Sequence, residues 1–567
     1  MSQSTLAQKN AAGAAKPVRK KARPIGEVVS VTGSHALLKL RSGGAFSALA
    51  RWERPQIGAI LSIDAGHHMA LGLVSAMSGP GTENSDADNG FAGGLVEVEL
   101  IGEFSKPSSK APARFRRGVS VYPGLGDVAH VASRDELAAL FNANPGANVR
   151  IGVIKQDATI PAAVSVNELF ARHCAVLGTT GSGKSCAATL MLNSVLNRFP
   201  HAHVVILDPH NEYANCFGER AVVFDAASLT MPFWMLTFDE LVEILYPGRR
   251  DCEEEIEILA ELIPTARKMN LSGALAGQRV LSDRRGDPNA VTVDTPTPYR
   301  VSELLTLLDK ALGGLDGNRS HAPFKRLRTR LQQISTDGRY SFMFGSLTVQ
   351  DTMSEFLGQL FRIPVNDAPV SVIELGGLPA EVAQVVVSVI ARMAFEFGIW
   401  SHGAAPISIV LEDAHRFAPS DRDQGFAPTR KALARIAKEG RKAGVSLWVN
   451  SQRPTELDST ILSQCNTIFA MRLTNQADQE ALKAAMPDAA TSLLSCLPSL
   501  GLGEAVAFGE AMALPTRIRF DALPRDLIPR SLTASFTDGW SVSIEDHAFL
   551  ERIVEQWRAQ RMLLPHV

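Results

Sequence analysis

The segment with the clearest chemical potential runs from Gly178 to Ser185 and reads GTTGSGKS. It matches the pattern G-x-x-x-x-G-K-[ST] and lies between an apolar run, HCAVL, and a helical run, CAATLMLNSVL. Glycines let the backbone N–H groups of such a loop point at phosphates, the lysine neutralises the β- and γ-phosphate oxygens, and the serine hydroxyl coordinates Mg²⁺. We therefore predict a site for a nucleoside triphosphate and Mg²⁺. The residues expected there are Gly178, Thr179, Thr180, Gly181, Ser182, Gly183, Lys184, Ser185 and Cys186.

Two acidic residues, Glu412 and Asp413, follow the apolar run ISIVL. At the end of a buried strand, one carboxylate can hold Mg²⁺ while its neighbour orients or deprotonates an attacking water. A helix N-cap is the structural alternative for such a pair, and the phosphate loop makes it the weaker interpretation. Asp208 and Glu212 are further candidates to approach the γ-phosphate or Mg²⁺, since ligands of open α/β sheets bind at the carboxyl ends of strands. A locally capped turn is the alternative for both.

These side chains need a sheet to position them, and seven apolar, β-branched runs predict one. Apolar strands alternating with segments of helical periodicity are typical of a parallel sheet covered on both faces, so we predict an α/β P-loop core of the RecA-like type. The sequence between residues 234 and 362 has helical periodicity, which indicates an inserted helical bundle. The predicted strands are HCAVLG, HVVILD, AVVFD, VSVIEL, ISIVLE, VSLWVN and TIFAMR.

The front of the chain has short β-type runs divided by glycine-rich turns, ending with VRIGVI, and predicts a small β-barrel. The first 23 residues carry six basic residues and no acid, which is typical of a disordered tail, with a weak nucleic-acid contact as the alternative. The last segment places Phe549, Leu550, Ile553, Val554 and Trp557 on one helical face. We expect this face to dock on its own chain, and docking on a neighbouring subunit is the alternative. The predicted divisions are a tail over 1–23, a barrel over 24–158, a motor core over 159–233 and 363–525, the bundle over 234–362 and a C-terminal extension over 526–567.

Composition excludes several classes of protein. The 567 residues carry a formal charge of -2, so the chain is not a strongly basic nucleic-acid binder and any such site must be local. Its six cysteines form no C-x-x-C pair, which argues against a disulfide framework or zinc site. No apolar run approaches a membrane span, so we expect a cytoplasmic protein without membrane contact.

Taken together, the motifs resemble those of the HerA-type ATPases, in the FtsK/HerA branch of P-loop motors. Two early segments, IGEVVSVTG and FRRGVSVYPGLGDVAHV, also look like the barrel that precedes the motor in that family. The resemblance covers most of residues 24–520, with the motifs in the family's order. The segments that carry it are RHCAVLGTTGSGKS, DPHNEY, VIELGGLPAEVAQVVV, LEDAHRFAP and AKEGRKAGVSLWVNSQRPTELDSTILSQCNTIFAMRLTNQAD.

The resemblance implies a homo-hexameric ring that hydrolyses ATP and translocates double-stranded DNA. It implies a partner effector as well: a NurA-like or other nuclease, or a sirtuin-like NAD hydrolase in phage defence. Carried over by position, Lys184 and Ser185 are the phosphate and Mg²⁺ residues, Glu412 is the Mg²⁺ acid and Asp413 is the candidate catalytic acid. The family usually has two glutamates here, and the shorter Asp413 would hold a catalytic water less favourably and slow turnover.

Ring ATPases of this kind also use an arginine finger reaching a neighbour's γ-phosphate. Arg441, just before the run GVSLWVN, is the first candidate, with Arg435 and Arg453 as rivals; an ordinary exposed arginine is the alternative for each. Gln452, at the end of that run, suits a polar sensor of the γ-phosphate or the water. The motif predicts that an isolated subunit is nearly inactive.

Candidate DNA contacts lie in the polar segment 416–430, through Arg416, Arg422 and Arg430. A second basic cluster, residues 325–330, is better explained as a solvated helical face. The chain shows no nuclease metal set or nucleophile triad, so cleavage would come from another chain. The alternative function is an ATP-regulated ring scaffold that assembles and activates an effector in anti-phage defence; a conjugation or secretion ATPase is weaker because no membrane segment is evident.

Overall fold

The computed structural model divides the chain into two compact units, Met1–Ala143 and Asn144–Val567. The predicted basic tail over 1–23 lies outside the described residues. The residues that the structure describes are 24–41, 54–79, 94–105, 115–141, 148–225, 228–229, 231–248, 251–277, 291–313, 320–344, 350–486, 488–530, 536–541 and 547–559.

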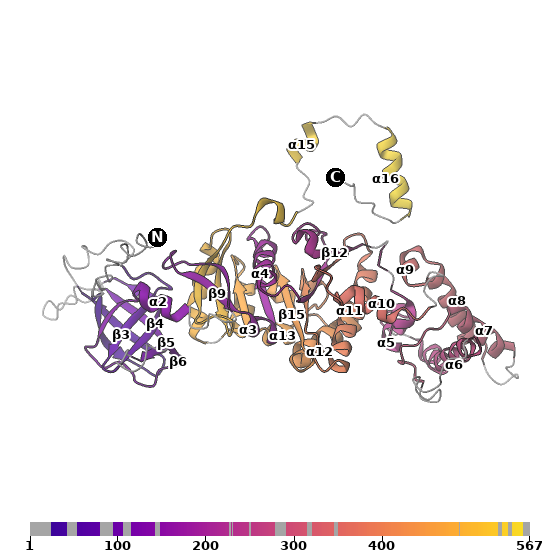
Figure 1. Cartoon of the computed structure of the whole chain (residues 1–567), viewed down its shortest axis with the longest axis horizontal. Helices are drawn as coiled ribbons and strands as arrows, with labels where there is room; N and C mark the ends of the chain where they lie inside the picture. Colours follow the sequence, from indigo (N-terminus) through magenta and orange to yellow (C-terminus); the bar gives the residue numbers. More distant parts are fainter. Residues whose placement is uncertain are drawn as a thin grey trace, which may run out of the picture. The chain divides into compact units, whose positions relative to one another are not determined.

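The first unit is the predicted β-barrel. Its strands are antiparallel in the order β2-β1-β7-β3-β4-β5-β6, and an additional β2–β5 pairing closes a ring of six strands, with β6 outside the ring on β5 (Figure 1). Alternate side chains fill the interior, among them Leu38, Ile63 and Val98. The elements are β1 Gly26–Val31, β2 His35–Leu40, β3 Ile60–Ala65, β4 His68–Ser78, β5 Leu95–Ser105, β6 Phe115–Arg117, β7 Val128–Val131 and α2 Arg134–Phe141.

An eleven-stranded sheet is the framework of the second unit, in the order β12-β13-β11-β14-β15-β10-β16-β17-β18-β8-β9. The seven predicted apolar runs are its strands β10 to β16, all paired in parallel as expected. The strands are β8 Asn148–Ile154, β9 Pro161–Ser165, β10 Cys174–Leu177, β11 His203–Asp208, β12 Ala221–Phe224, β13 Val370–Glu374, β14 Ile407–Leu411, β15 Val445–Ser451, β16 Thr467–Ala470, β17 Glu504–Gly509 and β18 Thr516–Phe520.

The barrel ends earlier than the predicted boundary at residue 158. The run VRIGVI, assigned to the barrel from its sequence, is β8 and pairs antiparallel with β18 through Ile154 and Ile518. Strands β17, β18, β8 and β9 thus extend the parallel sheet with an antiparallel edge. Local patterning cannot reveal this, because a β-type run carries no mark of which distant strand will pair with it.

Helices cover both faces of this sheet. Helix α4 connects β10 to β11, whereas α11 and α12 connect β13 to β14 and β14 to β15, in the opposite direction across the sheet. Because such crossovers are right-handed, α4 covers one face and α11 and α12 cover the other (Figure 1). The helices are α3 Val166–Ala171, α4 Lys184–Arg198, α5 Phe238–Leu245, α6 Glu253–Gly277, α7 Val301–Gly313, α8 Ala322–Thr336, α9 Ser341–Phe344, α10 Met353–Phe361, α11 Ala380–Trp400, α12 Ala427–Ala443, α13 Ser459–Gln464, α14 Gln476–Ala485, α15 Phe536–Ser541 and α16 His547–Ala559.

By length and composition alone, helix α11 could cross a membrane. The sequence-based expectation that no segment is apolar enough to do so is therefore wrong for this helix. However, 72% of its most apolar window is buried inside the molecule. It packs against α12 and the central strands β14 and β15. Its apolar composition is therefore that of a core helix surrounded by protein.

The helical insert consists of α5 to α10, between β12 and β13. Helices α6, α7 and α8 pack on one another, and the basic cluster of α8 is engaged within the bundle (Figure 1). Arg326 pairs with Glu255 of α6, Arg328 Nε donates to Asp309 of α7 at 2.7 Å, and Arg330 Nε donates to a carbonyl of α5 at 2.6 Å. These arginines join helices, which supports the structural interpretation of the cluster.

The C-terminal helix α16 does not show the predicted docking on its own chain. Its apolar face is exposed, with Leu550 57% and Trp557 80% accessible. An apolar stripe of this kind is usually covered in an assembly.

A buried carboxylate, Glu240, joins the insert to the core. It completes a capping box with Thr237 at the start of α5 and is only 1% exposed. Its oxygens accept hydrogen bonds from Ser388 Oγ at 2.8 Å and from Arg392 Nε at 3.2 and 3.3 Å, both on α11.

We expect Glu240→Ala to destabilise the fold by about 2–4 kcal/mol, because the Arg392 guanidinium then keeps only Glu396 as a carboxylate partner, and Ser388 Oγ loses its acceptor. Thermal unfolding measures the effect, with the exposed Glu261→Ala of α6 as the control within about 0.5 kcal/mol of the parent. Equal melting temperatures for the two variants would contradict the proposed anchoring.

Candidate active site

The phosphate loop connects β10 to α4, and its glycines fit positions that other residues would strain. Gly183 has φ 100° and forms the N-cap of α4. A Cβ on Gly178 would come within 2.8 Å of Ser182 Oγ and 2.9 Å of Met471 Cβ. The loop leaves the N-terminal N–H groups of α4 available to an anion. Lys184 Nζ donates to the Thr179 carbonyl at 3.3 Å.

Glu412 follows β14 directly, and β15 separates β14 from β10, the strand that leads into the phosphate loop. Its side chain is buried, and Oε2 accepts hydrogen bonds from Tyr213 OH at 2.6 Å and Asn450 Nδ2 at 2.7 Å. Burial raises the pKa of Glu412 to about 7, although both hydrogen bonds oppose the shift. Burial also lowers the pKa of Lys184, against the nearby charges of Glu412, Asp413 and Glu212.

Asp413 has a different environment from its neighbour. Its backbone is left-handed, with φ 47°, and Oδ2 accepts from His210 Nε2 at 2.7 Å and from Gln452 Nε2 at 3.2 Å. Burial pushes the pKa of Asp413 upward, but the hydrogen bond from His210 and the charges of His415 and Lys184 bring it below its usual value. The same hydrogen bond raises the pKa of His210. Asp413 is therefore ionised at neutral pH while Glu412 is near its midpoint.

A hydrogen-bonded chain leads from the phosphate loop to this aspartate. The Thr180 hydroxyl donates to Gln452 Oε1, and Gln452 and His210 both donate to Asp413. Sequence reasoning selected Thr180, Gln452 and Asp413 but assigned no role to His210, Tyr213 or Asn450. The motif DPHNEY contains two of these three, whereas Asn450 is marked only by being polar in an apolar strand.

Asp208, the last residue of β11, and Glu212, four residues later, have different surroundings in the structure. Asp208 is fully buried and accepts from the backbone N–H groups of His210 at 3.1 Å and Tyr213 at 2.9 Å, which is the capped-turn arrangement. Burial raises the pKa of Asp208. Glu212 instead reaches the phosphate loop, where its Oε2 accepts from Ser185 Oγ at 3.3 Å.

The donor set fits a triphosphate with Mg²⁺. Ser185, Glu412 and Glu212 offer the oxygen ligands that Mg²⁺ prefers, beside a lysine and a helix N-terminus. Within the described part of the chain, no group of three or more His, Cys, Asp or Glu side chains could hold a metal ion alone. Phosphate oxygens and waters would have to complete the metal shell, as is usual for Mg²⁺ bound with a nucleotide.

The three finger candidates lie at different places on the core. Arg441 is exposed in the last turn of α12, before the amino end of β15, and so lies at the sheet edge opposite the phosphate loop of its own chain. Arg435 stacks its guanidinium 4.3 Å from the ring centroid of Phe395. Arg453 follows β15 and pairs with Glu456 at 2.7 Å.

The segment 416–430 leaves the same sheet edge as the acids. Arg416 ends the short turn Ala414–Arg416 directly after Asp413, and it and Arg422 are exposed. Arg430 is half-buried in α12 and its Nη1 is buried, so it offers less to a DNA backbone than the other two.

Two hydrogen bonds join this segment to the loop that follows β15. Ser420 N donates to the Glu456 carbonyl at 2.8 Å, and Asp458 N donates to the Ala418 carbonyl at 2.9 Å. One loop begins at Asp413 and the other at Gln452, whose side chains are themselves hydrogen-bonded, so the two loops are joined at both places.

The raised pKa of Glu412 gives a stability prediction for the protein without nucleotide or Mg²⁺. The unfolded carboxyl titrates near 4.5 and the folded one at about 7, so the stabilisation from its protonated form is complete below pH 4.5 and is lost as pH rises through 7. Glu412→Gln keeps the acceptor oxygen without the charge. We expect it to stabilise the fold by about 3 kcal/mol at pH 8 and by under about 1 kcal/mol at pH 5.

Thermal unfolding at the two pH values measures this difference, with the exposed Glu261→Gln as a control that shows no pH-dependent gain. A Glu412→Gln variant whose melting temperature follows the parent at both pH values would show that the buried carboxyl is not protonated near neutrality.

Comparison with known proteins agrees with this geometry. The family described as "Helicase HerA, central domain" matches residues 149–394, beginning at β8. The chain is 26% identical over 497 residues to the DNA double-strand break repair helicase HerA of Pyrococcus furiosus, covering 80% of this chain and 85% of that protein. It is 23% identical over 496 residues to the DNA double-strand break repair helicase HerA of Saccharolobus solfataricus, covering 85% and 91%.

Among solved structures, VirB4 of Thermoanaerobacter pseudethanolicus aligns with a TM-score of 0.47 and 17% identity, over 68% of this chain and 99% of that chain. The sequence matches extend across the phosphate loop, the acid pair and the strands that position them. Residues 149–394 thus match the central domain of the HerA-type helicases, in the HerA/FtsK superfamily, and the chain is a P-loop ATP hydrolase of the helicase and translocase class.

Proposed function

We propose that this ATPase is a homo-hexameric motor that moves along double-stranded DNA and works with a partner effector enzyme. One observation carries the proposal: the hydrolytic acids and the exposed arginine loop leave the same strand end, with Asp413 and Arg416 three residues apart. A loop joined so directly to the catalytic strand can change position with the state of the nucleotide. The relatives named as DNA helicases support DNA as the track.

The residues divide the chemistry as follows. The loop N–H groups and Lys184 bind the β- and γ-phosphates, and Ser185 and Glu412 hold Mg²⁺, with Glu212 close to the same hydroxyl. Bound Mg²⁺ neutralises charge on the phosphate oxygens. Asp413, already ionised, accepts the proton of the attacking water, and Gln452 orients that water or senses the γ-phosphate.

The position of Arg441 supports a ring. Because it lies at the edge opposite its own phosphate loop, it cannot serve the site of its own chain but is available to a neighbour's γ-phosphate. An arginine supplied in this way is worth about 10³–10⁵ in turnover. Arg453 remains the rival candidate, whereas the stacking of Arg435 on Phe395 gives that arginine a role within its own subunit.

Partners are proposed on two grounds. Six copies of Arg416 and Arg422 would form a ring of positive charge, so a chain of net charge -2 can still grip phosphates. The exposed apolar face of α16 favours a protein contact, and the effector class we propose is a NurA-like or other nuclease, or a sirtuin-like NAD hydrolase. This leaves open the alternative of a ring scaffold that activates an effector in anti-phage defence. A cytoplasmic location stays a prediction.

We expect duplex DNA to stimulate ATP hydrolysis by the full chain, and Lys184→Ala to abolish hydrolysis because the phosphates lose their cation. Replacing Arg416 and Arg422 together by alanine should remove the DNA stimulation. Arg328→Ala, whose side chain is engaged within the bundle, is the matched control and keeps the stimulation.

Steady-state ATPase assays with and without duplex DNA make this measurement. A hexameric preparation whose hydrolysis ignores DNA would count against a translocase and favour the scaffold. If the ring is a scaffold, the Glu412→Ala variant should retain effector activity although it cannot move along DNA.

A second prediction concerns the contact between His210 and Asp413. His210→Ala should lower kcat by about 10- to 100-fold with little change in KM, because Asp413 loses a charge-assisted hydrogen bond that holds it toward the water. His210→Gln supplies an N–H donor and should recover most of the rate.

In an Asp413→Asn background, His210→Ala should cost nothing further, since the histidine acts through the aspartate. Steady-state kinetics of the four proteins complete the cycle. Additive losses would show that His210 acts independently of Asp413.

A further inference from the structure

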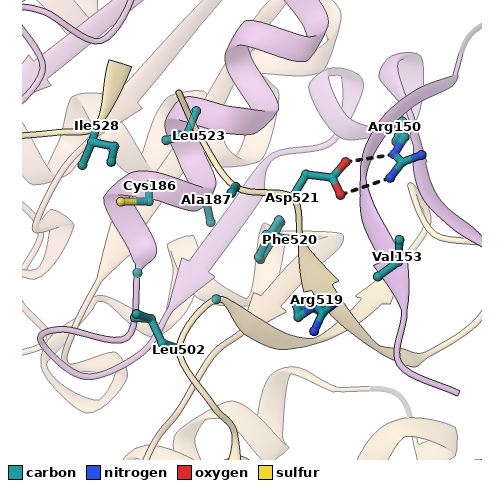
Figure 2. A pocket seen from close by; sticks show the side chains of 13 residues that line it. Arg150, Val153, Cys186, Ala187, Leu502, Arg519, Phe520, Asp521, Leu523 and Ile528 are labelled. Atoms are coloured by element: carbon teal, nitrogen blue, oxygen red, sulfur yellow. Dashed lines mark hydrogen bonds and ion pairs between the residues drawn. The ribbon is translucent and has the colours of Figure 1, made fainter. Parts of the chain in front are cut away.

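The phosphate loop has a different neighbour at each end. At its C-terminal end it borders a cavity of about 680 Å³, and Figure 2 shows Cys186 of α4 and Phe520 of β18 in the lining. At its N-terminal end it is held by the chain that follows β16. Thr179 donates twice to the Arg472 carbonyl, from its backbone N–H at 2.9 Å and from its hydroxyl at 3.1 Å. This part of the chain, residues 471–478, is therefore fixed to the phosphate loop.

Segment 471–478 connects β16 to the first turn of α14. Met471 N donates to the Leu177 carbonyl at 2.7 Å, which continues the pairing of β16 with β10 up to the phosphate loop. Further along the chain, Gln479 Nε2 of α14 donates back to the Leu473 carbonyl at 2.9 Å. These contacts hold the start of α14 in a defined position relative to the phosphate loop.

The first turn of α14 carries a buried carboxylate, Asp478, that reaches the loop after β15. Asp478 is 5% exposed, and its Oδ1 accepts from Thr455 twice, from the backbone N–H at 3.2 Å and from the hydroxyl at 2.8 Å. Thr455 lies in the short turn Pro454–Glu456, against which α14 packs. Hydrogen bonds to a buried carboxylate are strong and costly to break, so Asp478 fixes the position of this turn.

The loop that contains Thr455 begins with Gln452, which returns to the phosphate loop. Gln452 Oε1 accepts from the Thr180 hydroxyl, and its Nε2 donates to Asp413 at 3.2 Å. The contacts therefore form a closed path. Thr179 holds segment 471–478 at one end of this path, and Gln452 contacts the adjacent Thr180 at the other. Because both ends lie on the phosphate loop, the segment fixes where Gln452 lies relative to that loop.

We propose that segment 471–478 is a brace that positions Gln452 for ATP hydrolysis and that Asp478 is its positioning residue. The proposal rests on the function proposed above, in which Gln452 orients the attacking water or senses the γ-phosphate. Asp478 acts through Thr455 and not by contact with the reacting atoms. A displacement of about 1 Å in a catalytic group can slow a reaction about 10²-fold, so a contact outside the site can still control turnover. The motif that ends in LTNQAD thereby gains a role for its last residue.

Steady-state kinetics of the full chain test the brace. Asp478→Ala should lower kcat by about tenfold and change the KM for ATP by less than about twofold, because the phosphate loop keeps its own groups for binding. Asp478→Asn keeps an acceptor oxygen for Thr455 and should recover most of the rate. Glu480→Ala removes an exposed acid of the same helix and is the matched control, with the kcat of the parent protein.

A double-mutant cycle shows whether Asp478 acts through Gln452. In a Gln452→Ala background, Asp478→Ala should lower kcat by less than about twofold, since the side chain that it positions is gone. Additive losses would contradict the brace, as would a parent-like kcat in Asp478→Ala or a kcat for Asp478→Asn as low as that of Asp478→Ala. If Gln452→Ala itself keeps the parent kcat, the role given to Gln452 in the proposed function is wrong, and the brace has no side chain to position.

Thermal unfolding shows whether each variant is folded at the assay temperature. Thr455→Val removes the hydroxyl donor but keeps the backbone N–H and a side chain of similar shape, so it replaces Asp478→Ala in the cycle if that variant is unfolded. Thr455→Val should lower kcat by about threefold to tenfold, and this loss should disappear in the Gln452→Ala background. A loss that persists in that background would contradict the brace.

Discussion

The burial of Glu412 at the carboxyl end of β14 is the constraint on which the rest of the site depends. A carboxylate there can ionise only with help, and Tyr213, Asn450 and Lys184 provide it from three other elements. Their convergence requires β11, β14, β15 and β10 to lie side by side and in parallel, because only then do their carboxyl ends meet at one edge. A bound Mg²⁺ would therefore lower the free-energy cost of ionising this buried carboxylate.

The two adjacent acids show how one strand end can support two kinds of chemistry. Glu412 continues the strand inward and has a pKa of about 7, whereas the left-handed backbone of Asp413 directs its carboxylate toward His210 and keeps it ionised. Environments that separate the pKa values of neighbouring acids are typical of sites that bind a metal with one and move a proton with the other.

The strand ends of this site continue into two loops that contact each other. Asp413 and Gln452 each begin a loop, and backbone hydrogen bonds join the two loops through residues 418–420 and 456–458. On the other side of the phosphate loop, the segment after β18 ends against Glu212, where Arg530 N donates to the Glu212 carbonyl. Nucleotide binding would therefore act both on the loops proposed to contact DNA and on the C-terminal segment that leads toward the exposed helix α16.

The sequence by itself determined the parts that depend on neighbouring residues: the phosphate loop, the seven parallel strands, the acid pair and the helical insert, because loop spacing and apolar periodicity are local properties. Tertiary structure alone decided what depends on distant pairing. The run VRIGVI became a strand of the motor sheet because β18, more than 350 residues later, supplied its partner. His210, Tyr213 and Asn450 gained roles only when β11 and β15 carried them to Glu412 and Asp413. No sequence pattern encodes such contacts, since they arise from the strand order of the folded sheet.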